Sequence, residues 1–172
     1  AEPYIVAAMG SHGGATAEGQ RQILADYGIT EENMGCPVKS SMEVVQIGLS
    51  EKRNQPVYVD KNASQADGII LFNRVKPHTS FRGRYESGLM KMMAIGLGKQ
   101  VGAESIHHQS PAIMHELVEE YGRTILKNCP VLGGIAIIEN AYDETYLIKG
   151  LTADEIITEE PKLRDLSYKT IA

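Results

Sequence analysis

The sequence has no tryptophan, only two cysteines and no long apolar run, and the last two shortages each exclude a class of protein. Cys36 and Cys129 lie far apart and neither belongs to a Cys-x-x-Cys pair, so we do not expect a cysteine zinc clip. So little cysteine is typical of a reducing compartment, and we expect a cytoplasmic location. No segment approaches the roughly 18 consecutive apolar residues of a membrane span. The start, Ala1-Glu2-Pro3, also lacks the plan of a secretory signal.

Excess positive charge is also missing, because the net charge is −5 at pH 7 and the basic residues are scattered along the chain. A basic face for a polyanion is therefore not expected, and neither nucleic acid nor membrane is an expected partner. What is present is the composition of an ordinary folded domain, with 172 residues of which 42% are hydrophobic and 23% charged. We expect one domain over 1–172, and because the chain starts on Ala rather than Met we expect a processed form or a piece of a longer protein.

Short apolar segments alternate with helical patterns along the chain. The expected strands are 4–9, 37–40, 42–47, 56–60, 68–73, 134–140 and 146–149. The expected helices are 17–27, 86–97, 111–128 and a terminal helix from about 152. This alternation predicts an α/β fold with a mostly parallel, Rossmann-like sheet and helices on both of its faces.

The first motif that could carry chemistry follows the first expected strand and reads Gly10-Ser11-His12-Gly13-Gly14. Glycines after a parallel strand let backbone N–H groups approach an anion, and the next helix N-terminus adds a favourable partial charge. The same glycines could instead serve only the sterics of a tight turn. An imidazole at the carboxyl edge of the sheet, here His12, can exchange a proton near neutral pH.

The second motif is a basic loop after the expected strand 68–73. It holds His78 and four cations that could bind a carboxylate or phosphate: Arg74, Lys76, Arg82 and Arg84. Because His12 and His78 both follow strands of one expected sheet, we expect them to face a common substrate from two sides. The plain alternative is a solvated basic loop.

The third motif is the expected helix 86–97 with the histidine pair that follows it. Lys91 lies among methionines, where burial would lower the pKa of its amine and make it a better nucleophile. A lysine that extends its amine to solvent is the ordinary alternative. His107 and His108 are either a packed and an exposed residue or include a metal ligand, although no zinc spacing supports them.

Together these motifs resemble the nickel-pincer-dependent lactate racemase family, including its uncharacterised relatives, over most of the chain. Gly10-Ser11-His12 is similar to the loop with the family's first catalytic histidine, and Pro77-His78 to the segment with the second. Ser87-Gly88-Leu89-Met90-Lys91 resembles the segment whose lysine tethers the cofactor. The spacing that follows favours His107 over His108 as the nickel ligand.

The resemblance implies an isomerase, a racemase or epimerase of a 2-hydroxy acid. A nickel-pincer nucleotide would be attached through a thioamide to Lys91, and His107 would bind its nickel. His12 and His78 would exchange the hydroxyl proton while the carbon-bound hydrogen moves to the cofactor as hydride and returns to the opposite face.

The remaining implied roles are binding roles. Residues near the cofactor would be Gly10, Ser11, Gly13 and Gly88, and the substrate carboxylate would meet Arg74, Lys76, Arg82 or Arg84. The implied partners are the 2-hydroxy acid, the enzymes that mature the cofactor and a C-terminal domain of the same protein.

The sequence also departs from the racemase pattern. His12 is followed by Gly13 where the racemases have Arg, and the segment 82–86 replaces a glycine-rich one, so the identity of the 2-hydroxy acid stays open. Two alternatives remain. One is a non-catalytic nucleotide-binding or anion-binding α/β module that uses the glycine loop and the basic loop. The other is an enzyme that uses Lys91 to form a Schiff base.

Overall fold

The structure is a computed structural model that describes residues 1–171. Its strands are, in chain order, β1 (Ile5–Val6), β2 (Val38–Lys39), β3 (Val44–Leu49), β4 (Pro56–Asp60), β5 (Ile69–Arg74), β6 (Val131–Glu139) and β7 (Thr145–Thr152). Its helices are η1 (Gly13–Ala15), α1 (Ala17–Asp26), α2 (Glu31–Met34), α3 (Lys61–Ser64), α4 (Leu89–Lys91), η2 (Met92–Leu97), α5 (Lys99–His107), η3 (Pro111–Ile113), α6 (Met114–Asn128) and α7 (Ala153–Thr170). The expected elements are all present, and η1, α2, α3 and α5 are additional.

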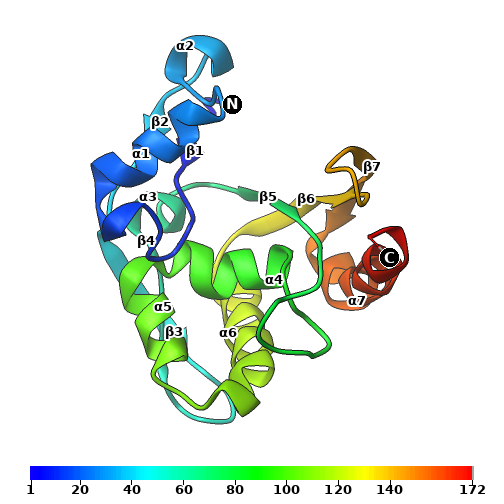
Figure 1. Cartoon of the computed structure of the whole chain (residues 1–172). Helices are drawn as coiled ribbons and strands as arrows, with labels where there is room; N and C mark the ends of the chain where they lie inside the picture. The colour runs from blue at the N-terminus through cyan, green and yellow to red at the C-terminus, as the bar shows by residue number, and fades with distance from the viewer. Residues whose placement is uncertain (172) are drawn as a thin grey trace.

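Within the described residues the strands form three small sheets rather than one (Figure 1). β1 pairs with β2 in parallel, β3 pairs with β4 antiparallel, and β5, β6 and β7 form a mixed sheet in that order. The α/β class is therefore confirmed. The mostly parallel, Rossmann-like sheet that the sequence predicted is not what these strands form.

Short connections explain the antiparallel pairs. Residues 50–55 join β3 to β4, and residues 140–144 join β6 to β7. In the second link the side chain of Asn140 accepts hydrogen bonds from the N–H groups of Tyr142 (2.9 Å) and Glu144 (3.0 Å). Because a parallel pair needs a crossover of about a dozen residues or more, these links allow only hairpins.

The sheet of β5, β6 and β7 has one covered and one open face. Along β5, Ile69 and Leu71 are buried, and a Cβ on Gly134 of β6 would lie only 2.8 Å from Leu89, so α4 packs on this face. The helices expected on both faces are thus found on one. The opposite face carries exposed apolar side chains: Ile70, Phe72, Tyr146 and Ile148.

The helical run from α4 to α5 turns at Lys99. Residues Met92–Leu97 adopt the wider π-helical winding, and Lys99 has a left-handed φ of 53°. Figure 1 shows α5 leaving in a new direction from the axis of α4. This φ is uncommon for any residue except glycine, so the surroundings must hold it.

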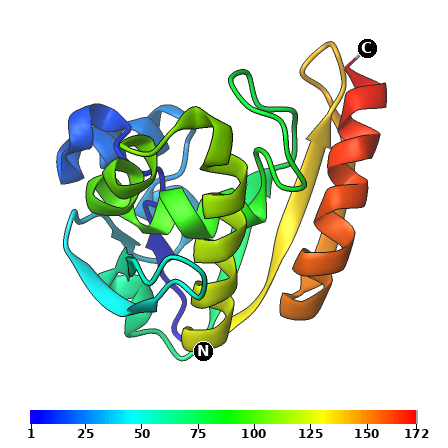
Figure 2. The same cartoon turned by 90° about the horizontal axis from the view of Figure 1, so that it is seen from below.

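The loop 75–88 lies between the ends of α6 and α7 (Figure 2). Gly83 of this loop touches the Cβ of His115 on α6, and Arg164 on α7 donates a hydrogen bond to the Gly83 carbonyl. The core continues beneath it through buried side chains of α4, η2 and α6, among them Met90, Met93 and Leu117. Among the described residues, no helix combines the length and the apolar character that a membrane crossing requires.

Candidate functional site

The loop around His12 is a compact turn between β1 and α1. Gly10 and Gly13 have φ angles of 60° and 65°, and a Cβ on Gly13 would lie 2.6 Å from the backbone of Gly19. Glycine is therefore required at Gly13 both by conformation and by space. The N–H of Gly10 donates to the carbonyl of Gly96 (3.1 Å) and that of His12 to Met9 (3.1 Å), so these donors are used inside the protein.

A buried polar chain holds this loop from below. The side-chain amide of Gln20 donates to the carbonyls of Gly10 (2.8 Å) and His12 (3.0 Å), and its oxygen accepts from the amine of Lys99 (3.2 Å). The amine of Lys99 lies 3.4 Å from Oδ2 of Asp60. Gln20, Lys99 and Asp60 have no exposed surface, so the chain is shielded from water. The His12 side chain itself is exposed and makes no hydrogen bond or ion pair with the described residues.

The loop around His78 is fixed through its histidine ring and backbone. The ring stacks on Phe81 with 4.1 Å between centroids, and Nδ1 accepts a hydrogen bond from the N–H of Ser80 (3.1 Å). A neutral imidazole that accepts at Nδ1 carries its proton at Nε2. His78 therefore presents an N–H donor at Nε2.

Glu86 anchors this second loop. Its carboxylate is 2% exposed and accepts hydrogen bonds from the N–H of His78 (2.7 Å) and from the hydroxyl of Tyr168 (3.0 Å). Arg164 lies 3.7 Å away and supplies a positive charge. Because Tyr168 and Arg164 both belong to α7, the terminal helix holds the loop in place.

The start of α4, which carries Lys91, is also tied to α7. The buried carboxyl group of Glu160 accepts a hydrogen bond from the N–H of Met90 (3.1 Å), and a Cβ on Gly88 would lie only 2.5 Å from its Oε1. Burial raises the pKa of Glu160 to about 7, although hydrogen bonds from the Met90 and Leu89 N–H groups oppose the shift. Gly88 is thus required by the close approach of α7.

Lys91 and His107 both act on His78 through their charge, although the three residues come from three segments. Burial lowers the pKa of the Lys91 amine, and repulsion from Lys76 lowers it further. The pKa of His78 falls through burial first and then through the charge of Lys91, against the opposing effect of Glu86; His107 also contributes. Charges separated by much more than about 10 Å are screened by salt, so these groups share one small region.

His107 is exposed at the end of α5, and the described residues contain no group of three or more His, Cys, Asp or Glu side chains that could hold a metal. A metal carried entirely by protein ligands therefore does not fit here. A metal that arrives with most of its ligands and needs one histidine does fit, because His107 makes no ion pair with the described residues.

The four predicted cations differ in their availability. Arg74 is paired with Glu139 (2.7 Å), and Arg84 is drawn to Glu119 (4.0 Å). Lys76 makes no ion pair within residues 1–171 and lies close enough to Lys91 to lower the pKa of its amine. Arg82 lies 3.9 Å from Glu86 and donates to the carbonyls of its own loop. Lys76 and Arg82 are thus the cations beside the histidine and the lysine.

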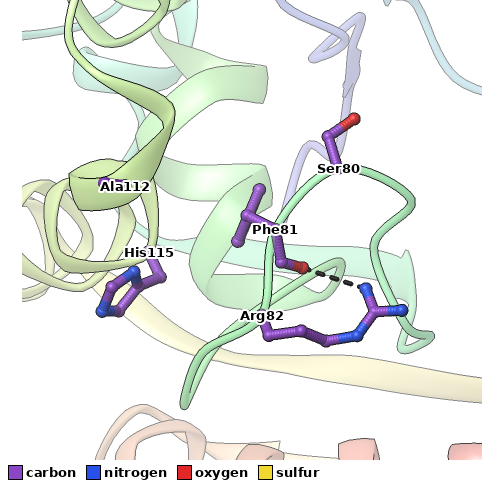
Figure 3. A pocket seen from close by; sticks show the side chains of 5 residues that line it. All are labelled: Ser80, Phe81, Arg82, Ala112 and His115. Carbon is purple, nitrogen blue, oxygen red and sulfur yellow. Dashed lines mark hydrogen bonds between the residues drawn. The ribbon is translucent and has the colours of Figure 1, made fainter.

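A recess of about 280 Å³ adjoins the His78 loop (Figure 3). Ser80, Phe81 and Arg82 line it from the loop, and Ala112 and His115 from the start of α6. The guanidinium of Arg82 turns away from His115 toward the Phe81 carbonyl (3.2 Å). The recess thus combines apolar Phe81 and Ala112 with polar Ser80, Arg82 and His115, next to the ring that stacks on His78.

The supporting residues were not predicted from the sequence. They are Gln20, Asp60, Glu86, Lys99, Glu160, Arg164 and Tyr168. One available signal was a charged residue within an apolar stretch, as for Lys99 after Ile95-Gly96-Leu97-Gly98. The partners lie so far along the chain that spacing alone could not have paired them.

Comparison with known proteins gives two matches. The sequence profile of the lactate racemase N-terminal domain matches residues 2–129. The structure is similar to that of the lactate racemase apoprotein from Thermoanaerobacterium thermosaccharolyticum, with a TM-score of 0.58 at 10% sequence identity, over 93% of this chain and 48% of that one. No curated protein matches the chain in sequence. The chain thus spans about half the length of the racemase whose fold it shares.

Proposed function

The chain belongs to the lactate racemase N-terminal domain family, and on this premise we propose that it is the catalytic-histidine domain of a racemase or epimerase of a 2-hydroxy acid. In this proposal a nickel-pincer nucleotide is tethered to Lys91. The protein is a longer, cytoplasmic, two-domain enzyme of which residues 1–172 form one domain. The observation that carries the proposal is the convergence of Lys91, His78 and His107 from three separate segments.

The setting of Lys91 fits a covalent tether. Its amine is partly buried, its pKa is lowered, and it makes no ion pair within the described residues. A neutral amine is the form that attacks a carbonyl or thiocarbonyl carbon, so burial raises the reactive fraction at neutral pH. Gly88 lets the start of α4 pack against Glu160, which fixes the helix that carries the lysine.

His107 fits the role of a single protein ligand to nickel. It ends α5, its charge acts on His78 and its side chain is exposed, so an imidazole nitrogen is free to bind. When bound, the nickel-pincer nucleotide supplies an electrophilic carbon that can take up and return the C2 hydrogen of the substrate. Ser11 and Gly13 on the first loop would border the nucleotide, and Gly10, whose carbonyl accepts from Gln20, would shape the turn that presents them.

His12 and His78 are the proposed proton carriers. His78 carries its proton at Nε2, and the lone pair at Nδ1 accepts a hydrogen bond from the Ser80 N–H. To take the hydroxyl proton of the substrate, His78 must release Nδ1 from Ser80, which requires a shift of loop 78–80. His12 has no such engagement and can accept a proton without rearrangement.

The carboxylate of the substrate is expected at Lys76 and Arg82. Lys76 makes no ion pair within the described residues and acts on Lys91, and Arg82 bonds to the carbonyl of His78, whereas Arg74 is held by Glu139 at 2.7 Å. The recess at Phe81 and Ala112 would take the substituent on C2.

The geometry supports the non-catalytic anion-binding alternative less well. The N–H groups of Gly10 and His12 already donate to Gly96 and Met9, so the glycine loop offers fewer donors to an anion than its sequence suggests. A Schiff-base enzyme would also use Lys91, but would have no need of His107.

The test is intact mass and nickel content of the full-length protein, produced together with enzymes that mature the cofactor. We expect an added mass equal to the tethered nucleotide and about one nickel per chain. Lys91→Ala should lose both signals and all activity, whereas Lys127→Ala, an exposed lysine on α6, should lose neither. His107→Ala should keep the added mass and lose the nickel.

His12→Ala and His78→Ala should keep mass and nickel and lower turnover of 2-hydroxy acids by roughly 10²-fold or more. An added mass that persists in Lys91→Ala would contradict the tether. An unmodified wild-type protein, made under conditions that load a known racemase, would contradict the proposed function as a whole.

A further inference from the structure

Lys99 stands midway between the two residues proposed to hold the cofactor, eight positions after Lys91 and eight before His107. If the helix ran straight through these 16 positions, its rise of about 1.5 Å per residue would separate the two Cα atoms by about 24 Å. The bend at Lys99 breaks that line, and α5 runs in a different direction from α4 (Figure 1).

The bend rests on a residue that is costly in two ways. A lysine with a φ of 53° is strained, and a lysine with no exposed surface keeps its amine away from water. Burial lowers the pKa of this amine, and Asp60 opposes the shift. Such a combination persists only where specific partners hold it.

Those partners come from three other elements. The amine of Lys99 donates to the carbonyl of Ala7 after β1, to the side chain of Gln20 on α1 and toward Asp60 at the end of β4. Oδ2 of Asp60 has no other polar partner among the described residues, while Oδ1 caps α3 by accepting from Ala63 (2.9 Å). Every contact of the amine is therefore buried and intramolecular.

One of these contacts, the bond to Gln20, links Lys99 to the loop that carries His12. Gln20 accepts from Lys99 and donates to the carbonyls of Gly10 and His12. The same amine thus fixes the direction of α5, which ends in His107, and the backbone on which His12 stands.

We propose that Lys99 is a positioning residue of the site: paired with Asp60 and bonded to Gln20, it sets His107 and His12 relative to Lys91. The inference rests on the proposed function for the roles of His12, Lys91 and His107. The bend and its dependence on the Lys99 amine do not, so the two can fail separately.

The direct test is a distance measurement in the apoprotein. Spin labels are placed at Glu104 on α5 and Lys162 on α7, both exposed, in the full-length protein with Cys36 and Cys129 replaced by serine. α7 serves as the reference because Glu160 bonds it to the start of α4. Double electron–electron resonance then gives the distance between the two labels, which reports the direction of α5 relative to α7.

Three variants are compared with wild type. Asp60→Asn keeps the cap of α3 and leaves Lys99 its bonds to Ala7 and Gln20. The distribution of distances between the labels should therefore stay narrow. Lys99→Met in the Asp60→Asn background differs only by the loss of the amine, and its distribution should shift and broaden by about twofold. Lys99→Gly in the same background also removes the amine, but glycine adopts the left-handed backbone without strain. This variant replaces Lys99→Met in the measurement if the Met variant does not fold.

An unchanged distribution in either folded double variant would overturn the inference. The second measurement is nickel retention by the loaded protein, where the double variant should keep the added mass on Lys91 and lose nickel about tenfold faster. Equal retention would also count against Lys99. If wild type carries no cofactor, the proposed function fails, and the distance measurement still decides the role of Lys99.

Discussion

The loop around His12 and the loop around His78 carry equivalent proposed roles but are held by different parts of the chain. The first rests on side chains with no exposed surface, Gln20 and Lys99, and both lie inside the segment 2–129 that defines the family. The second rests on Glu86, whose partners Arg164 and Tyr168 belong to α7, beyond that segment. One loop is thus anchored in the family core and the other by a terminal helix.

The difference predicts unequal consequences when an anchor is removed. A buried ion pair that loses one partner leaves a charge in a dry interior, whereas an anchor that keeps several donors loses only one of them. The loop at His12 should therefore be rigid and fail together with the fold. The loop at His78 should loosen while the fold persists, which suits a loop that must release Ser80 during proton transfer.

The largest effect is expected at Lys99. Lys99→Met leaves the Asp60 carboxylate buried without its partner, and we expect a loss of about 3–5 kcal/mol in the free energy of unfolding, measured by urea denaturation. Asp60→Asn should lose much less, because its amine partner keeps two other acceptors. A loss below about 1 kcal/mol for Lys99→Met would remove the basis of the comparison.

The next effect concerns Glu160 and pH. Because its folded pKa of about 7 lies above the ordinary 4.5, the folded protein binds this proton more tightly than the unfolded chain. Its contribution to stability is therefore complete below about pH 4.5 and is lost as pH rises through 7, by up to about 3 kcal/mol. Glu160→Gln should lack this fall. The wild-type protein should therefore lose stability relative to Glu160→Gln as the pH rises from 5 to 8. A difference that does not vary with pH would contradict the assignment.

Tyr168→Phe tests the anchor of the second loop. It removes one hydrogen bond to a buried carboxylate that keeps Arg164 and the His78 N–H, so we expect a loss of about 1.5 kcal/mol. Hydrogen exchange should speed up at the amide of His78 and not at that of Gly10. The matched control, Tyr146→Phe, changes an exposed ring on β7 and should alter neither. Equal acceleration at both amides would show that the loops are not anchored independently.

The smallest effect on stability is expected at Arg82. Its side chain is 64% exposed and lies 3.9 Å from Glu86, so Arg82→Ala should change the free energy of unfolding by less than about 0.5 kcal/mol. Its proposed contact with the substrate carboxylate should instead appear as a higher KM with little change in kcat. A large loss of stability would place Arg82 among the anchors.

Much of the secondary structure was predictable from local pattern. The capping box formed by Thr152 and Glu155 starts α7 where expected, and the apolar spacing of α6 matches 111–128. The expected helix 86–97 begins only at Leu89, because Ser87 pairs with Lys76 across the loop. The expected strand 4–9 shortens to Ile5–Val6, since only that part finds a partner in β2.

Pairing and support were not predictable in the same way. Periodicity identifies a strand without saying which neighbour it joins, so the antiparallel partners of β3 and β6 were missed. The short connections that follow these strands are visible in the sequence and indicate hairpins. Candidate residues with reactive groups stood out in the sequence. The groups that hold them, such as Tyr168 on Glu86 across 82 positions, are joined only by tertiary packing.

The π-helical segment η2 makes the length of this stretch matter more than its composition. Such a winding holds one residue more than an α-helix of the same span, so deleting a single residue within Met92–Leu97 would relax it to ordinary helix. Residues beyond that deletion, Lys99 and His107 among them, would keep their places, whereas a further deletion would rotate them by about 100° around the axis and carry Lys99 away from Asp60. Related sequences should therefore tolerate exchanges among apolar residues here and the loss of one residue, but not of two.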